Sequence, residues 1–159
     1  MRTNLEDDIL ILLSDVARHM RTYADQIARM HGMTRAQWII LARLERQPDL
    51  SQNELAALAE FAPITLARLV DRLEELGFVK RCADPEDRRI WRLRITPEAA
   101  PILRKIELFR VELHELMTME IDPWFLDAMV IGLHQMKESL SSSRRLAKAS
   151  RGERPNIKA

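Results

Sequence analysis

The sequence has little cysteine, few aromatic residues and no excess of charge of either sign. A single cysteine, Cys82, in 159 residues excludes a disulfide framework and a thiolate metal cluster, and it fits a reducing compartment. The formal net charge is +1, so a nucleic-acid partner depends on where the charges lie rather than on their sum. The four histidines show no compact ligand spacing, so we expect no metal site and no cofactor.

Long apolar runs and catalytic motifs are also missing from the sequence. The N-terminal segment is acidic at residues 6–8, where a signal peptide is basic, and the apolar run at residues 9–13 is too short for a membrane span. We therefore expect a cytoplasmic protein without a membrane partner. No Gly-rich phosphate loop, nucleophile elbow or acid–base pair of carboxylates supports an enzyme. The length favours a single domain, which we place at residues 1–147.

Apolar residues that recur at alternating spacings of four and three predict long helices at both ends of the chain. The first is expected over residues 5–31, closed by Gly32. The others are expected within residues 97–146, with a break before Pro123, and Pro101 would cost one of them a hydrogen bond. Residues 148–159 are basic and are predicted to be a disordered tail.

The middle of the chain carries three strong signals for helix starts. Thr34 with Gln37, and Ser51 with Glu54, have the spacing of capping boxes. After a three-residue turn, Pro63 at the first helical position begins another and longer helix. Two helices joined by such a short turn are a helix-turn-helix pattern.

The periodicity changes after Gly77, where that helix is expected to end. Residues 78–83 and 90–95 are predicted strands, since the second alternates between apolar and basic side chains. Residues 80–94 hold six basic and three acidic residues, a local positive excess that the whole-chain charge conceals. A hairpin with a charged tip after a helix-turn-helix is a wing. We therefore predict a mainly α fold in which residues 34–96 form a winged helix-turn-helix with a small β-hairpin wing.

This arrangement indicates double-stranded DNA as a partner. The second helix of a helix-turn-helix presents its N-terminal residues to base edges in the major groove. The candidates for contact there are Pro63, Ile64, Thr65, Arg68 and Arg72. Thr65 can bond a base or contact a thymine methyl group, Arg68 can reach guanine or a phosphate, and Ile64 offers only apolar contact. The plainer alternatives are a helical bundle and a solvated basic hairpin, and the order of the elements favours DNA binding over both.

Several stretches resemble the multiple-antibiotic-resistance regulator (MarR) family, and the flanking helices match it in order and length. They are Leu50-Ser-Gln-Asn-Glu-Leu-Ala, Arg68-Leu-Val-Asp-Arg-Leu-Glu-Glu-Leu-Gly-Phe-Val, Asp84-Pro-Glu-Asp-Arg-Arg and Leu93-Arg-Ile-Thr96. The resemblance implies a transcription regulator, typically a repressor on a pseudo-palindromic operator, and a homodimer whose first and last helices interdigitate. It also implies that Arg88 and Arg89 reach the minor groove and that Asp87 orients a wing arginine.

The resemblance further implies an effector site for a phenolic or aromatic acid. Arg18 and Arg21 resemble the basic positions of such sites, and Trp38 resembles an aromatic wall. Solvated arginines and a tryptophan in an N-terminal hydrophobic staple explain the same residues without a ligand. For the whole chain, the alternative to a DNA-binding regulator is a winged-helix protein-interaction module, against which Arg88 and Arg89 argue.

Overall fold

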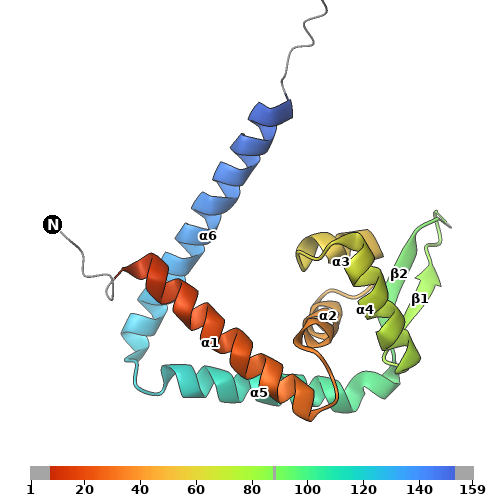
Figure 1. Cartoon of the computed structure of the whole chain (residues 1–159), viewed down its shortest axis with the longest axis horizontal. Helices are drawn as coiled ribbons and strands as arrows, with labels where there is room; N and C mark the ends of the chain where they lie inside the picture. The colour runs from red at the N-terminus through yellow and green to blue at the C-terminus, as the bar shows by residue number, and fades with distance from the viewer. Residues whose placement is uncertain (1–7, 88, 153–159) are drawn as a thin grey trace, which may run out of the picture. The chain divides into compact units, whose positions relative to one another are not determined.

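The computed structural model describes residues 8–87 and 89–152 (Figure 1). Arg88 and residues 153–159, which carry parts of the wing and tail predictions, lie outside the described residues. The elements along the chain are α1 (Ile9–Met30), α2 (Arg35–Arg46), α3 (Gln52–Leu58), α4 (Pro63–Glu75), β1 (Val79–Ala83), β2 (Trp91–Ile95), the 3-10 turn η2 (Pro97–Ala99), α5 (Ala100–Thr118) and α6 (Pro123–Gly152). This is the mainly helical fold with one hairpin that the sequence predicts.

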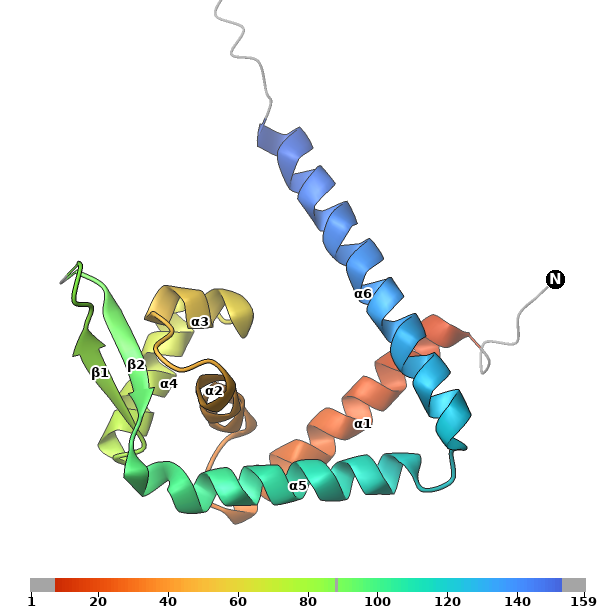
Figure 2. The same ribbon diagram turned by 180° about the vertical axis from the view of Figure 1, so that it is seen from behind.

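The chain divides into two compact units, Met1–Val111 and Glu112–Ala159. The first unit holds the core, whose largest fully buried side chains come from α2, α3, α4 and β2: Ile40, Leu41, Leu44, Leu55, Leu66, Leu73, Leu93 and Val70. In this unit α2, α3 and α4 pack together, and the hairpin lies beside α4 in both views (Figures 1 and 2). The helix-turn-helix and the hairpin thus share one core, and that core fixes the surface that they present.

Both predicted capping boxes are present. The Thr34 N–H donates to Gln37 Oε1 at 2.8 Å, and the Gln37 N–H donates to Thr34 Oγ1 at 3.3 Å. The Ser51 N–H donates to Glu54 Oε2 at 2.7 Å, and the Glu54 N–H donates to Ser51 Oγ at 3.2 Å. These bonds satisfy backbone donors that a helix start leaves without intrahelical partners, so α2 and α3 begin where the sequence predicts.

The first helix is described from Asp8 onward, and residues 5–7, where the predicted helix begins, lie outside the described residues. Asp8 is the N-cap of α1, since its Oδ1 accepts a hydrogen bond from the Leu10 N–H at 2.8 Å. A side-chain acceptor of this kind is typical of a helix N-cap. At the other end Gly32 adopts a φ of 69°, as expected for the residue that closes a helix.

The entry to α5 differs from the expected geometry. The Thr96 hydroxyl donates to the Gly77 carbonyl oxygen, and residues 97–99, expected within a helix, form the 3-10 turn η2. Helix α5 therefore begins at Ala100, which places Pro101 in its first turn. A missing N–H costs little there, because first-turn donors have no intrahelical acceptor. The hydrogen-bond penalty predicted for Pro101 is thus avoided.

The second unit contains the end of α5 and all of α6. Asp122 Oδ1 accepts from the Trp124 N–H at 2.8 Å and so caps α6, which continues to Gly152, past the boundary expected at residue 147. Neither glycine nor proline interrupts residues 133–151, which explains the longer helix. No residue of α6 between 123 and 143 is buried. Its exposed large apolar side chains are Trp124, Phe125, Met129, Val130, Ile131, Leu133, Met136 and Leu140.

Among the described residues, no helix is both long enough and apolar enough to cross a membrane.

Candidate nucleic-acid interface

Helix α4 has one buried face and one exposed face. Leu66, Val70 and Leu73 are buried in the core. The residues predicted to contact DNA from this helix are all exposed: Pro63, Ile64, Thr65, Arg68 and Arg72. Pro63 stands at the first helical position, so the helix begins abruptly after the turn and leaves its N-terminal end uncovered.

The two arginines of this exposed face differ in their surroundings. Arg72 Nη1 lies 2.7 Å from Glu75 Oε2, and both side chains are more than half exposed. Pairs of this kind contribute little and are readily exchanged for another partner. The Arg68 side chain makes no hydrogen bond or ion pair with another described residue. Arg68 is therefore the cation of α4 that is available to a base or a phosphate without breaking a protein contact.

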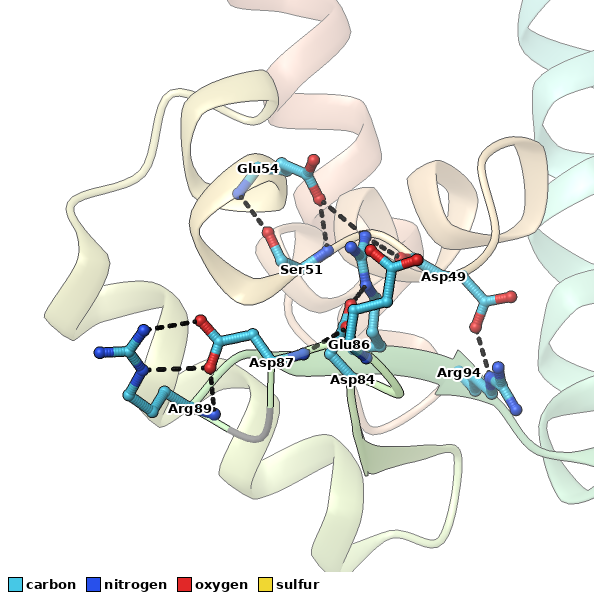
Figure 3. Close-up of polar contacts among 9 residues, drawn as sticks. Asp49, Ser51, Glu54, Asp84, Glu86, Asp87, Arg89 and Arg94 are labelled. Atoms are coloured by element: carbon cyan, nitrogen blue, oxygen red, sulfur yellow. Dashed lines mark hydrogen bonds and ion pairs between the residues drawn. The ribbon is translucent and has the colours of Figure 1, made fainter.

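The turn of the hairpin is organised around Asp84, which directly follows β1 (Figure 3). Asp84 Oδ1 accepts from the Glu86 and Asp87 N–H groups at 2.8 and 3.1 Å, and Asp84 Oδ2 accepts from Arg92 Nε at 2.6 Å. The Arg92 hydrogen bond, followed by the two backbone bonds, lowers the pKa of Asp84 below its ordinary 3.8. Asp84 thus shapes the turn that carries the tip. This role of Asp84 was not predicted from the sequence, although an Asp before Pro85 is a turn signal.

The tip itself contains a two-point ion pair. Arg89 Nε lies 3.1 Å from Asp87 Oδ1, and Arg89 Nη2 lies 3.1 Å from Asp87 Oδ2. The Arg89 side chain bond is the largest cause that lowers the pKa of Asp87, and the pKa of Arg89 is raised in turn. The Arg89 side chain remains 90% exposed. Asp87 can therefore hold this guanidinium outward without removing it from solvent.

A second set of contacts ties the hairpin to the connection between α2 and α3 (Figure 3). The Leu93 N–H donates to the Leu50 carbonyl oxygen at 2.9 Å, and Arg92 Nη1 donates to the Asp49 carbonyl oxygen at 3.0 Å. The Asp49 carboxylate pairs with Arg94. The φ of Asp49 is 64°, a conformation that Asp tolerates better than most residues. The hairpin is thus fixed to the segment between α2 and α3 by the edge of β2 that faces away from β1.

The residues proposed for an effector do not form one contact cluster. Arg18 Nη2 bonds Asp15 Oδ1 at 2.7 Å, and Arg18 and Arg21 are both exposed. Trp38 is only 5% exposed and belongs to the core.

Trp38 instead belongs to an aromatic cluster that the sequence analysis missed. Its ring stacks on His31 with centroids 5.8 Å apart and meets Phe109 edge-on at 5.5 Å. Lys105 Nζ lies 3.4 Å from His31 Nδ1. The indole Nε1 is buried and has no hydrogen-bond partner among the described residues. No sequence spacing indicates this group, because Phe109 is far from Trp38 along the chain.

A helix-turn-helix with a hairpin after its second helix, flanked by long helices, defines the winged helix-turn-helix class. A family model described as MarR family matches residues 31–90. The chain is similar to solved structures over most of its length. It is 27% identical to a structure named MarR, with a TM-score of 0.72, covering 91% of this chain and 98% of that one.

Two further structures report bound partners in their descriptions. A MepR–DNA complex from S. aureus is 21% identical, with a TM-score of 0.75, covering 86% of this chain and 99% of that one. BpsR of Bordetella bronchiseptica, whose DNA binding is regulated by 6-hydroxynicotinic acid, is 19% identical, with a TM-score of 0.73, covering 86% and 98%. Residues 31–90 thus match the MarR family model, and the chain over most of its length shares the fold of the structure named MarR.

Proposed function

We propose that this protein is a sequence-specific DNA-binding transcription regulator, not an enzyme, that acts as a homodimer in the cytoplasm. The observation that carries the proposal is the exposed N-terminal end of α4, with Ile64, Thr65 and Arg68 uncovered, on the same lobe as the hairpin that holds Arg89 outward. A helix end that enters the major groove reads bases, while wing arginines reach the backbone or the minor groove. Pro63 and Arg72 complete the proposed contact surface on α4, and Arg88 completes it on the wing.

The direct test selects the DNA. Genomic fragments of the source organism are incubated with the protein, retained fragments are sequenced, and the recovered site is footprinted. We expect a two-fold symmetric site whose half-sites lie about one helical turn, roughly 10 base pairs, apart. Retention without enrichment of any sequence would contradict sequence-specific binding. It would favour the alternative, a winged-helix module that binds another protein.

The homodimer is supported by apolar side chains left exposed on the flanking helices. In α1 these include Leu10, Leu12 and Val16, and in α6 they include Trp124 and Leu140. Amphipathic helices of this length are stable only when their apolar faces are covered, and closed two-fold assembly is the commonest solution. Light scattering at micromolar concentration should report twice the chain mass of 18.5 kDa. A stable monomer would contradict both the dimer and the palindromic site.

Repression is proposed as the direction of regulation. A transcription template that carries the selected site, with and without the protein, tests this directly. A fall in transcript supports repression, and a rise would make the protein an activator.

The proposal also includes an effector, an aromatic acid that binds the protein and weakens operator binding. The unpartnered indole Nε1 of Trp38 supports a polar ligand near the aromatic cluster, and Arg18 and Arg21 are exposed cations on the neighbouring helix α1. A carboxylate or phenolate could pair with a guanidinium while its ring contacts aromatic side chains. Such a ligand weakens operator binding only as far as it prefers the DNA-free protein.

The effector site is tested by titrating a protein–operator complex with salicylate-like acids. The wild type is compared with Arg21→Ala and with Arg29→Ala, a matched change of an exposed α1 arginine that is not in the proposed site. We expect release of the wild type and of Arg29→Ala, and weaker release of Arg21→Ala. Equal release of all three proteins would place the site elsewhere.

A further inference from the structure

Arg81, on the first strand of the hairpin, connects three elements of the DNA-binding lobe. Its side chain is 20% exposed and extends from β1 to helices α3 and α4. Arg81 Nη2 lies 2.7 Å from Asp71 Oδ1, and Nη1 pairs with Glu74. Its other acceptors are Gln52 Oε1 at 3.3 Å and the Ala67 carbonyl oxygen at 3.4 Å. One guanidinium thus joins the hairpin to both helices of the helix-turn-helix.

The backbone of Arg81 strengthens the same connection. Its N–H donates to Glu74 Oε1 at 2.8 Å, so Glu74 receives bonds from both the main chain and the side chain of one residue. A planar guanidinium with five donors can hold several acceptors at once, which a lysine ammonium cannot do in the same geometry. The arrangement sets how α4 sits against β1.

Of the acidic partners of Arg81, Asp71 is the one that lies on the proposed DNA-contacting face of α4. It follows Arg68 by three residues and Ile64 by seven, so it lies on the same face of α4 as both, and its side chain is 57% exposed. A carboxylate on a face that enters a DNA groove repels the phosphates. The Arg81 guanidinium beside it offsets that charge.

We propose that Arg81 is a positioning residue for DNA binding, which holds α4 against the hairpin and cancels the Asp71 carboxylate on the DNA-facing side. This rests on the proposed DNA-binding function. Arg81 acts through Asp71 and Glu74 rather than by reading bases. Removing Arg81 therefore weakens binding to any duplex, and removing Asp71 as well restores a large part of that loss.

The test measures the affinity of Arg81→Met, Asp71→Asn and the double variant for two duplexes by fluorescence anisotropy. One duplex is selected from random sequences by the wild type, and the other is a mixed-sequence duplex of equal length. Arg94→Met is the matched control, because Arg94 is also a hairpin arginine with one acidic partner, Asp49, which lies outside α4. Thermal unfolding of every variant is recorded in parallel.

We expect Arg81→Met to lose about tenfold in affinity for both duplexes near 0.1 M salt, since like charges across an interface are costly. Asp71→Asn should recover most of that loss in the Arg81→Met background and change the wild type by less than about threefold. Arg94→Met should stay near the wild type. Arg81→Lys, which keeps the charge and can be used if Arg81→Met does not fold, should retain mixed-sequence binding but discriminate less between the duplexes.

Three outcomes would overturn the inference. Arg81→Met could bind as well as the wild type, or Asp71→Asn could have the same effect in both backgrounds. If Arg81→Met does not fold, the inference would be overturned by an Arg81→Lys variant that discriminates between the two duplexes as well as the wild type does. A wild type that binds neither duplex would instead overturn the proposed function, and the inference with it.

Discussion

Asp84 and Arg92 form a charged hydrogen bond of 2.6 Å where the turn of the hairpin begins, with the Asp84 side chain only 8% exposed. Arg92 Nη1 donates to the Asp49 carbonyl oxygen and lies 3.4 Å from Glu54 Oε2. A carboxylate that orders the hairpin turn is thus coupled to the residues that precede and begin α3. The position of the wing tip depends on this pair.

Replacing Asp84 by Asn should destabilise the fold, because the amide cannot supply two anionic oxygens to Arg92 and to the turn N–H groups. Thermal unfolding should show a lower midpoint than for Asp15→Asn, which removes one partner of an exposed pair with Arg18. Amide hydrogen exchange should speed up at Glu86 and Asp87. Equal midpoints for the two variants would show that the Asp84 pair is not structural.

Folding stability should decrease in acid. The pKa values of Asp84, Asp87 and Glu54 are lowered in the folded protein, chiefly by hydrogen bonds from Arg92, Arg89 and the Ser51 N–H respectively. A lowered carboxyl pKa contributes stability that is fully present above the ordinary values of 3.8 for Asp and 4.5 for Glu, and that is lost as the pH falls through the folded pKa. Urea unfolding from pH 7 to pH 3 measures this. The Asp84→Asn variant should show a shallower decline.

Substitutions on the buried face of the helix-turn-helix should lower stability, whereas substitutions on its exposed face should weaken DNA binding. Leu41→Ala, at a fully buried position, should cost about 2–5 kcal/mol in the free energy of unfolding. Ile64→Ala, where the side chain is 68% exposed, should change stability by less than about 0.5 kcal/mol. The same Ile64 change should weaken binding to the selected operator by about 1 kcal/mol. A large loss of stability in Ile64→Ala would mean that this residue is structural.

Replacing the helix arginine and replacing the wing arginine should have different effects on DNA binding. Arg68→Ala should reduce discrimination among operator variants by about 1–3 kcal/mol, as expected for a lost base contact. Arg89→Ala should weaken binding to all sequences and lower the salt slope of log K by about one unit. Arg104→Ala, an exposed arginine on α5, is the control and should change neither quantity. Identical profiles for Arg68→Ala and Arg89→Ala would contradict the division between the helix and the wing.

The local elements of this fold could be predicted from the sequence because their signals act within a few residues. The boxes at Thr34 and Ser51, the proline start of α4 and the left-handed Gly77 each depend on neighbours one turn away. The hairpin followed from the alternation of β2. The same pattern predicted that Ile64, Thr65 and Arg68 are exposed, because a helix with a buried stripe must present its remaining face to solvent.

What only the tertiary structure decided are the contacts between residues distant in the chain. The Thr96 hydroxyl donates to the Gly77 carbonyl oxygen, and Trp38 contacts Phe109 rather than an exposed arginine. Arg81 reaches Asp71 and Glu74 across the packed lobe. Several acceptors within reach of one guanidinium compete as partners, and packing of the core decides which of them lie at bonding distance. A sequence pattern states which groups can pair, whereas the folded geometry selects the pairs that form.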